Sequence, residues 1–241
     1  MPHNDDDDHI RFAEFPLVGL PIRARTNWNV GTREISFSGE VQNYCVCFID
    51  IIGSTKTSSD LSPNQLSRYY ELFLNAIALI TRNFGAKIVK NAGDTLIFYF
   101  NDISDPKNVI KFKNVLECGL TMGIASNTLN AKMLPEKLPP VQHRISADYG
   151  KVSIVRSASS QSEDLFGSAM NICAKINSKA RPNGLVIGET LFDIVKALEE
   201  YKFVPSGEKL IGMKGDYGVY HVVHKEKRTI MNPFDRRPMD Y

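Results

Sequence analysis

The sequence lacks any apolar run long enough to cross a membrane, and it carries little net charge. No window of its 241 residues approaches the roughly 18 uninterrupted apolar residues of a membrane-spanning helix. The N-terminus has four aspartates, Asp5 to Asp8, where a secretion signal has a basic and then an apolar stretch. A net charge of +2 is too small to favour nucleic acid or an anionic membrane surface. We therefore expect a soluble, cytoplasmic protein with no nucleic-acid partner and no membrane insertion.

Cysteines are also few and are not arranged for metal binding. The four of them include no CxxC pair, and no set of histidines accompanies them at zinc spacing. Cys45 and Cys47 share one face of an expected strand, which favours a role as small buried apolar groups. No disulfide is expected. At 43% hydrophobic residues, the chain is long enough for one domain with a full core, flanked by tails.

Two aspartates each follow an apolar run, and they are the first candidate functional residues. Asp50 comes directly after the run Tyr44–Ile49. Asp94 ends the turn sequence Asn91-Ala92-Gly93-Asp94 between two expected strands. If that hairpin pairs with the first strand, the two carboxylates become neighbours. Taken singly, Asp50 could cap a helix and Asp94 could be a plain turn residue.

A pair of carboxylates with few other ligands suits Mg²⁺ or Mn²⁺, which keep waters and take further oxygens from substrate phosphates. The loop Gly53-Ser54-Thr55 follows Asp50 and precedes a helix. Its backbone N–H groups are candidates for binding those phosphates.

Hydrophobic spacing predicts two amphipathic helices around this hairpin. The first begins at Pro63 after an N-cap Ser62 and ends before Gly85. The second carries apolar side chains at helical spacing over 112–122. Residues 127–140 contain three prolines and no lasting period, so we interpret them as a connector.

Residues 145–155 alternate and change direction near Gly150, which predicts a hairpin of two strands. Asp148 lies in that turn, where a solvated or capping role is favoured over metal binding. The order strand, helix, hairpin, helix, strand is βαββαβ, and it predicts an α+β fold with a ferredoxin-like core and helices packed on one face of the sheet. The remaining expected elements are a strand at 185–187, a helix at 189–198 and a last strand at 219–223 that closes the sheet.

A polar stripe marks a further helix after Asp164. Its members recur at helical spacing and are Ser168, Asn171, Lys175 and Ser178. A solvated helix face gives the same pattern. The stripe nevertheless lacks the mixture of long acidic and basic side chains that a free surface usually has, which favours a functional role.

These stretches together resemble a known family. Phe48–Thr55 followed by Lys90–Asp94 resembles the catalytic domain of the class III nucleotidyl cyclases, the adenylate and guanylate cyclases. The match continues through 144–152, 164–175 and 214–220. It implies a catalytic domain over residues 41–224, with an N-terminal extension at 1–40, partly disordered, and a C-terminal tail at 225–241.

The resemblance also implies where the active sites lie. In this family they form between two catalytic domains arranged head to tail, and one chain here carries both sets of residues, so the implied assembly is a homodimer with composite sites. One protomer would hold two metal ions, Mg²⁺ or Mn²⁺, through Asp50, Asp94 and the carbonyl of Ile51. The partner would supply the base-reading pair Lys90 and Asp164, the ribose-orienting Asn171, Lys175 facing the α-phosphoryl group, and Lys214 on the terminal phosphates.

The implied reaction is the conversion of ATP to 3′,5′-cyclic AMP and pyrophosphate. Lys90 can donate to adenine N1 and Asp164 can accept from the N6 amine. Lys175 departs from the family, which usually has arginine there; a lysine keeps the charge without the planar fork. The alternatives are a nucleotide-binding regulatory module that has lost catalysis and a cyclase that uses GTP, UTP or CTP. A polymerase or diguanylate cyclase is disfavoured, since the chain has no GGDEF-type signature and no basic template groove.

Overall fold

The structure is a computed structural model, and it describes residues 35–101, 103, 105–157, 163–207, 210 and 217–225. The expectations for residues 1–34 and for the tail beyond 225 lie outside this part of the chain, as does Lys214. None of the helices in the described residues is both long and apolar enough to cross a membrane.

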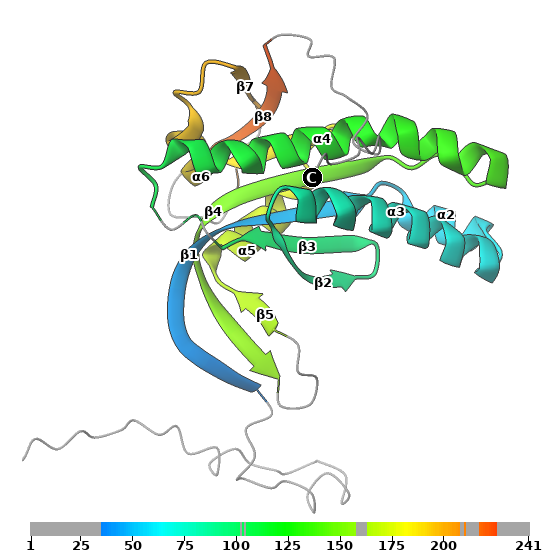
Figure 1. The fold of residues 1–241 in the computed structure, drawn as a ribbon, viewed down its shortest axis with the longest axis horizontal. Helices are drawn as coiled ribbons and strands as arrows, with labels where there is room; N and C mark the ends of the chain where they lie inside the picture. Colours follow the sequence, from blue (N-terminus) through cyan, green and yellow to red (C-terminus); the bar gives the residue numbers. More distant parts are fainter. Residues whose placement is uncertain are drawn as a thin grey trace, which may run out of the picture.

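The predicted βαββαβ core is confirmed. Its strands form an antiparallel sheet in the order β2-β3-β1-β4, which is the ferredoxin-like arrangement. The helices α3 and α4 lie side by side on one face of this sheet (Figure 1). In chain order the elements are β1 (Ile35–Ile51), α3 (Pro63–Asn83), β2 (Lys87–Ala92), β3 (Thr95–Phe100), α4 (Val109–Met133) and β4 (His143–Ser157).

The start of α3 shows how local sequence sets these boundaries. The Ser62 hydroxyl accepts a hydrogen bond from the Gln65 N–H, and the Gln65 side chain accepts one from the Ser62 N–H, so the predicted capping box is present. Pro63 occupies the first helical position. At the other end, Gly85 follows the C-cap with a φ of 78°, a conformation that costs glycine little.

The second half of the chain extends the sheet to the order β2-β3-β1-β4-β6-β8-β7. The strand β5 is outside this order and pairs with the later part of β4, after the part that pairs with β6. The strand β6 runs parallel to β4, and the other pairings are antiparallel. The elements are β5 (Glu163–Phe166), α5 (Ser168–Asn177), β6 (Gly184–Gly188), α6 (Glu189–Val195), β7 (Tyr201–Pro205) and β8 (Val219–His224), with two short helices, α2 (Ser54–Asp60) and η2 (Leu134–Glu136), earlier in the chain.

Among the described residues, three hydrophobic clusters fill the two sides of the sheet. The largest lies under α3, α4 and α6. A second lies on the opposite face, between β1, β3, β4, β5 and α5; its buried members are Tyr44, Val46, Tyr99, Val152, Leu165 and Ala169. The third packs α5 against β6 and β8, with buried members Ile172, Ile176, Ala180, Val186, Leu210 and Val219. The two long helices thus cover one face, as predicted, and the short α5 covers part of the other. All four cysteines are buried and free, as expected.

The predicted turn at Gly150 is wrong, because β4 is one continuous strand of 15 residues. A Cβ atom at Gly150 would lie 3.4 Å from the Ala169 side chain, so this glycine marks the close approach of α5 to the strand. The change of direction comes after Ser157, and β5 is the returning strand.

Asp148 is therefore buried in mid-strand, and a solvated role for it is wrong. It accepts hydrogen bonds from the Leu191 N–H (3.2 Å) in the first turn of α6 and from the Tyr217 hydroxyl (2.6 Å), so it does bond to the start of a helix, but from the middle of a strand and not from the expected turn. Burial raises the pKa of Asp148 to about 6, against the lowering effect of these two bonds.

Two further boundaries differ from expectation. The proposed connector at 127–140 starts too early, since α4 continues to Met133 and buries Leu129 and Met133 against the core. The strand β7 was not predicted, and β8 lies inside the sheet instead of closing it. β7 is short and only partly buried, so it lacks the apolar run that identifies a central strand.

Candidate active site

The structure brings Asp50 and Asp94 together at one end of β1. In the register of β1 with β3, Asp50 lies opposite Thr95, the residue that follows Asp94. The Thr95 hydroxyl donates a hydrogen bond of 2.8 Å to Oδ1 of Asp50. Gly93, with a φ of 66°, allows the tight turn that carries Asp94. The neighbourhood expected from the hairpin is thus confirmed.

The pKa of Asp50 shows that its negative charge is unfavourable in this place. Burial raises the pKa of the Asp50 carboxyl, and the neighbouring Asp94 carboxylate raises it further. The hydrogen bond from Thr95 and the positive charge of Arg144 lower it. A cation placed between the two carboxylates relieves their repulsion.

The donor set fits a hard divalent cation. Within the described residues, no group of three or more His, Cys, Asp or Glu side chains is arranged to hold a metal ion. Mg²⁺ accepts a site in which the protein supplies two carboxylates, and water and substrate phosphate supply the remaining oxygen ligands. Zinc and calcium sites take more of their ligands from the protein.

The loop after β1 presents free backbone N–H groups beside these carboxylates. Gly53 has a φ of 72° and precedes α2, and among the described residues no side chain caps this helix. The first N–H groups of a helix have no partner within it. Those of Ser54 and Thr55 therefore remain available to solvent or to a ligand.

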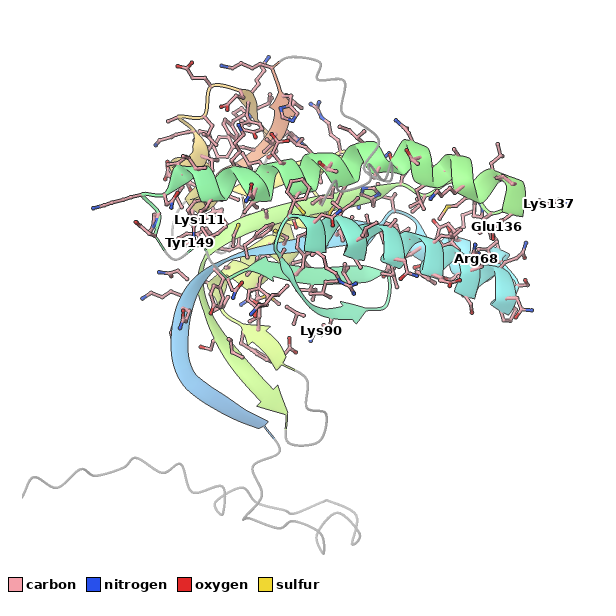
Figure 2. All side chains as sticks on the ribbon, viewed as in Figure 1. Arg68, Lys90, Lys111, Glu136, Lys137 and Tyr149 are labelled. Carbon is pink, nitrogen blue, oxygen red and sulfur yellow. The ribbon has the colours of Figure 1, made fainter. Side chains whose placement is uncertain are left out.

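Lys90 on β2 and Asp164 on β5 form an ion pair within one chain. The two strands are not hydrogen-bonded to each other, but the curved sheet brings them side by side (Figure 1), and Figure 2 labels Lys90. The register of β2 with β3 shifts at Val89, and a bulge of this kind re-aims the side chain that follows it, here Lys90. The other oxygen of Asp164 accepts a hydrogen bond from the Leu165 N–H. The Lys90 side chain is 44% exposed and that of Asp164 is 30% exposed, so the pair is accessible to a ligand.

The polar stripe of α5 is on its solvent face. Asn171 and Lys175 are exposed, whereas Ile172 and Ile176 on the opposite face are buried against the sheet. Asn177 fixes the end of the helix by donating to the Phe48 and Arg144 carbonyls at 3.4 and 3.3 Å, alongside the Ser146 hydroxyl. Asn171 and Lys175 consequently face away from the sheet that holds Asp50.

Comparison with known proteins places this geometry in a family. A family model described as the adenylate and guanylate cyclase catalytic domain matches residues 37–225. The chain belongs to this family. A cytidylate cyclase from Staphylococcus aureus is 25% identical over 203 residues, a match that covers 82% of this chain and 45% of that protein. The chain therefore spans less than half the length of this relative.

Solved cyclase structures share the fold. The adenylyl cyclase CyaB from P. aeruginosa superimposes with a TM-score of 0.69 at 19% identity and covers 78% of this chain and 98% of its own. The guanylyl cyclase Cya2 gives a TM-score of 0.67 at 18% identity, covering 79% and 96%. The guanylate cyclase domain of RhGC from Catenaria anguillulae, in complex with GTP, gives 0.62 at 16% identity, covering 78% and 100%.

Two side chains of the cyclase domain that the sequence did not single out lie at the carboxylate pair. Arg144 lies opposite Asp50 in the β1–β4 register, and its charge acts on the Asp50 carboxyl. Its Nε atom is buried without a hydrogen-bond partner in the described part of the chain. Thr95 is the other. Both contacts depend on strand register, which could not be read from one sequence.

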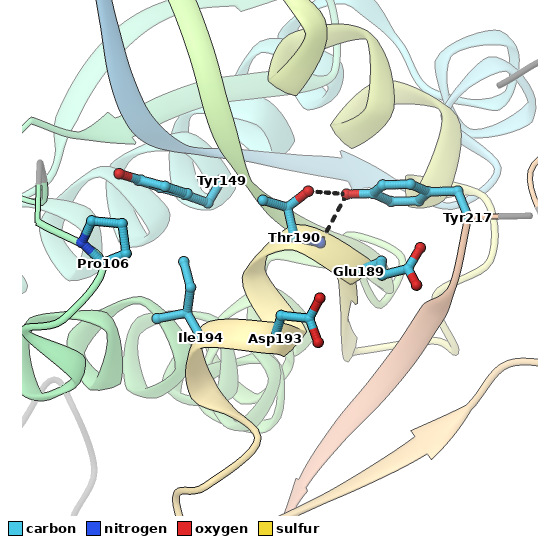
Figure 3. A pocket seen from close by; sticks show the side chains of 7 residues that line it. All are labelled: Pro106, Tyr149, Glu189, Thr190, Asp193, Ile194 and Tyr217. Carbon is cyan, nitrogen blue, oxygen red and sulfur yellow. Dashed lines mark hydrogen bonds between the residues drawn. The ribbon is translucent and has the colours of Figure 1, made fainter. Parts of the chain in front are cut away.

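A cavity of about 450 Å³ lies elsewhere in the cyclase domain (Figure 3). The Tyr217 hydroxyl at its wall lies 3.0 Å from the Thr190 N–H, which donates to it, and 2.9 Å from the Thr190 hydroxyl. None of the predicted site residues lines this cavity. Its lining consists of Pro106, Tyr149, Glu189, Thr190, Asp193, Ile194 and Tyr217.

Proposed function

We propose that this cyclase domain converts a nucleoside triphosphate into its 3′,5′-cyclic monophosphate and pyrophosphate, using Mg²⁺ or Mn²⁺ held at Asp50 and Asp94. The observation that carries the proposal is the proximity of these two carboxylates at the end of β1 in a domain of this family. When bound, two such ions would favour loss of the ribose 3′-hydroxyl proton and balance the triphosphate charge. The Ile51 carbonyl, next to Asp50, stays a predicted third ligand.

The protein groups supply position and charge. The 3′-oxygen forms a bond to the α-phosphorus while the bond to the pyrophosphate oxygen breaks, so negative charge grows on the leaving group. Arg144 beside Asp50 and the N–H groups after Gly53 are proposed to stabilise phosphate oxygens on the metal-binding side. Lys175 and Asn171 of the partner are proposed to act from the other side, and Lys214 keeps its predicted role on the terminal phosphates.

The ion pair of Lys90 and Asp164 supports a base with an amino group beside a ring-nitrogen acceptor. Adenine presents this edge through N6 and N1, which makes ATP the substrate favoured by the sequence. Cytosine presents the same edge through N4 and N3, and the Staphylococcus aureus relative is named a cytidylate cyclase. CTP is therefore the second candidate. Guanine and uracil present the opposite edge.

The assembly proposed is a head-to-tail homodimer. The support is the orientation of α5, whose Asn171 and Lys175 face solvent and away from the sheet that carries Asp50 of the same chain. In a two-fold dimer, Asn171 and Lys175 of one copy can lie opposite Asp50 and Asp94 of the other, which gives two composite sites.

The test is a turnover assay. The purified protein is incubated with Mn²⁺ or Mg²⁺ and each of ATP, CTP, GTP and UTP, and products are identified by mass. A 3′,5′-cyclic product from ATP or CTP is expected, with little from GTP or UTP. Tight nucleotide binding without any cyclic product supports the regulatory module instead.

The shared site makes a prediction about mixed dimers. Asp50→Ala and Asn171→Ala should each be inactive alone, but a mixed dimer keeps one site in which both residues are intact. Equal mixing with subunit exchange should therefore restore about a quarter of the wild-type rate. Exchange is followed by energy transfer between labelled chains. Full exchange without recovered activity contradicts the head-to-tail dimer.

Lys175 gives a second prediction. Lys175→Ala should lower kcat by roughly 10²–10³-fold, the usual effect of losing one group that stabilises developing charge. Lys175→Arg should keep or raise kcat, because a guanidinium can bind two phosphoryl oxygens at once. Lys179→Ala, in the turn directly after α5, is the control. Normal turnover of Lys175→Ala assigns Lys175 to an ordinary solvated helix face.

A further inference from the structure

Thr95 is linked to both candidate metal-binding residues, to Asp94 by the peptide bond and to Asp50 by a side-chain hydrogen bond. It follows Asp94 directly, and its backbone pairs with Ala92 across the tight hairpin and lies opposite Asp50 on β1. Its hydroxyl donates to Oδ1 of Asp50 at 2.8 Å. The backbone of Thr95 therefore fixes the turn that carries Asp94, while its side chain fixes Asp50.

The hydrogen bond restricts a torsion that is otherwise loose. The last torsion of an aspartate is broad and roughly two-fold, so an unrestrained carboxylate samples many orientations. An ionised carboxylate has about four lone-pair positions on its two oxygens. The Thr95 donor occupies one position on Oδ1, and the other positions face Asp94, which also hydrogen-bonds to Asp50, and the place where a cation shared by the two carboxylates would bind.

The side chain of Thr95 is itself well placed for this task. Threonine is branched at Cβ, which restricts its first torsion and so the direction of its hydroxyl. Thr95 is the first residue of β3 and is partly exposed, so the hydroxyl is not needed to complete the core. Its hydrogen bond to Asp50 is the side-chain contact that distinguishes threonine from an apolar residue of the same shape.

We propose that Thr95 is a positioning residue for metal binding, which holds the Asp50 carboxylate in the orientation that a divalent cation shared with Asp94 requires. This inference rests on the proposed function. Groups that hydrogen-bond to metal ligands typically change metal affinity or activity by about 10–100-fold when removed. We expect an effect of that size, exerted through Asp50, since Thr95 is not assigned a contact with the cation or the nucleotide.

Thr95→Val tests the proposal, because valine keeps the branched shape and removes the hydroxyl. Mn²⁺ binding to the full chain is titrated by paramagnetic resonance, without nucleotide, and compared with wild type. Thr95→Val should raise the Kd for Mn²⁺ by about 10–100-fold, and Thr95→Ser should restore it to near the wild-type value. In turnover assays the Mn²⁺ concentration for half-maximal rate should rise in Thr95→Val, with kcat largely recovered at saturating Mn²⁺.

Thr81→Val is the matched control. It removes a buried hydroxyl that donates to the Ile77 carbonyl inside α3, so it measures the loss of a threonine hydrogen bond away from the carboxylates. It should leave the Kd for Mn²⁺ unchanged. If Thr95→Val does not fold, the same comparison is made between Thr95→Ser and Thr95→Ala.

The outcomes separate the two proposals. Unchanged Mn²⁺ affinity in a folded variant without the Thr95 hydroxyl overturns the role of Thr95 and leaves the proposed function intact, provided that wild type binds Mn²⁺ and cyclises a nucleotide. A wild type that binds no Mn²⁺ overturns both. A fall in thermal stability without a change in Kd assigns Thr95 a structural role and rejects the inference.

Discussion

Asp50→Ala and Asp94→Ala are each expected to reduce cyclisation below about one thousandth of the wild-type rate, since each removes a predicted ligand of ions that support both the attacking and the leaving oxygen. The fold should persist, because Asp94 lies in a turn and Asp50 at the end of a strand. The pKa of Asp50 is raised in the folded protein. At a pH above the ordinary aspartate pKa, ionised Asp50 therefore lowers the free energy of unfolding, whereas at lower pH this destabilisation is absent. Asp94→Ala removes the repulsion between the two carboxylates, which is one part of this destabilisation, so it should slightly raise the Tm of the metal-free protein at neutral pH.

The measurements are a cyclisation assay with Mn²⁺ and a thermal melt of each variant without metal. Asp193→Ala is the control, because this exposed aspartate of α6 pairs with Lys196 at the end of the same helix, away from the carboxylate pair. It should keep the wild-type rate. Normal turnover by Asp94→Ala rejects the two-carboxylate site, whatever the Tm shows.

Exchanging the base-reading pair is expected to reverse the base preference. In wild type, ATP or CTP should be preferred over GTP and UTP by up to about 10⁴-fold, because a base with the wrong edge covers Lys90 and Asp164 without giving them hydrogen-bond partners. The double variant Lys90→Glu/Asp164→Cys should prefer GTP or UTP, since glutamate accepts from a ring N–H and a thiol donates weakly to a carbonyl oxygen. The structure makes the double change necessary, because either single variant leaves the other member of the ion pair without its partner.

The readout is kcat/KM for the four nucleotides in wild type and in the double variant. Lys87→Glu on the same strand is the control, because Lys87 is exposed and lies before the bulge. It should leave the order of the four nucleotides unchanged. A wild type that prefers GTP or UTP rejects the assignment of Lys90 and Asp164 to the base.

Local patterns were sufficient for much of this fold. The capping box at Ser62 and the turn before Asp94 depend on neighbouring residues, and both were predicted correctly. The pairing of β1 with β3 followed from two apolar runs and one hairpin, which is why Asp50 and Asp94 could be expected together.

The errors at Gly150 and Asp148 share a cause, which is contact with distant parts of the chain. Gly150 resembles a turn residue until α5 is seen packed on it, and Asp148 looks solvated until α6 and Tyr217 cover it. Arg144 and Thr95 belong to the carboxylate pair only through the register of β1 with its two neighbours. A single sequence does not contain that register.

The bulge at Val89 also bears on how copies of the chain can meet. β2 is an outer strand of the sheet, and outer strands invite further strands from other molecules, which leads to aggregation. The irregular register at Val89 and the lysines on either side of it, Lys87 and Lys90, disfavour such strand addition. At the opposite margin, β7 is only five residues long and ends at Pro205, which has no N–H to offer a new strand. The β2 and β7 margins of the sheet therefore disfavour intermolecular β-pairing, which favours the faces and loops of the domain as the contact surface of the proposed dimer.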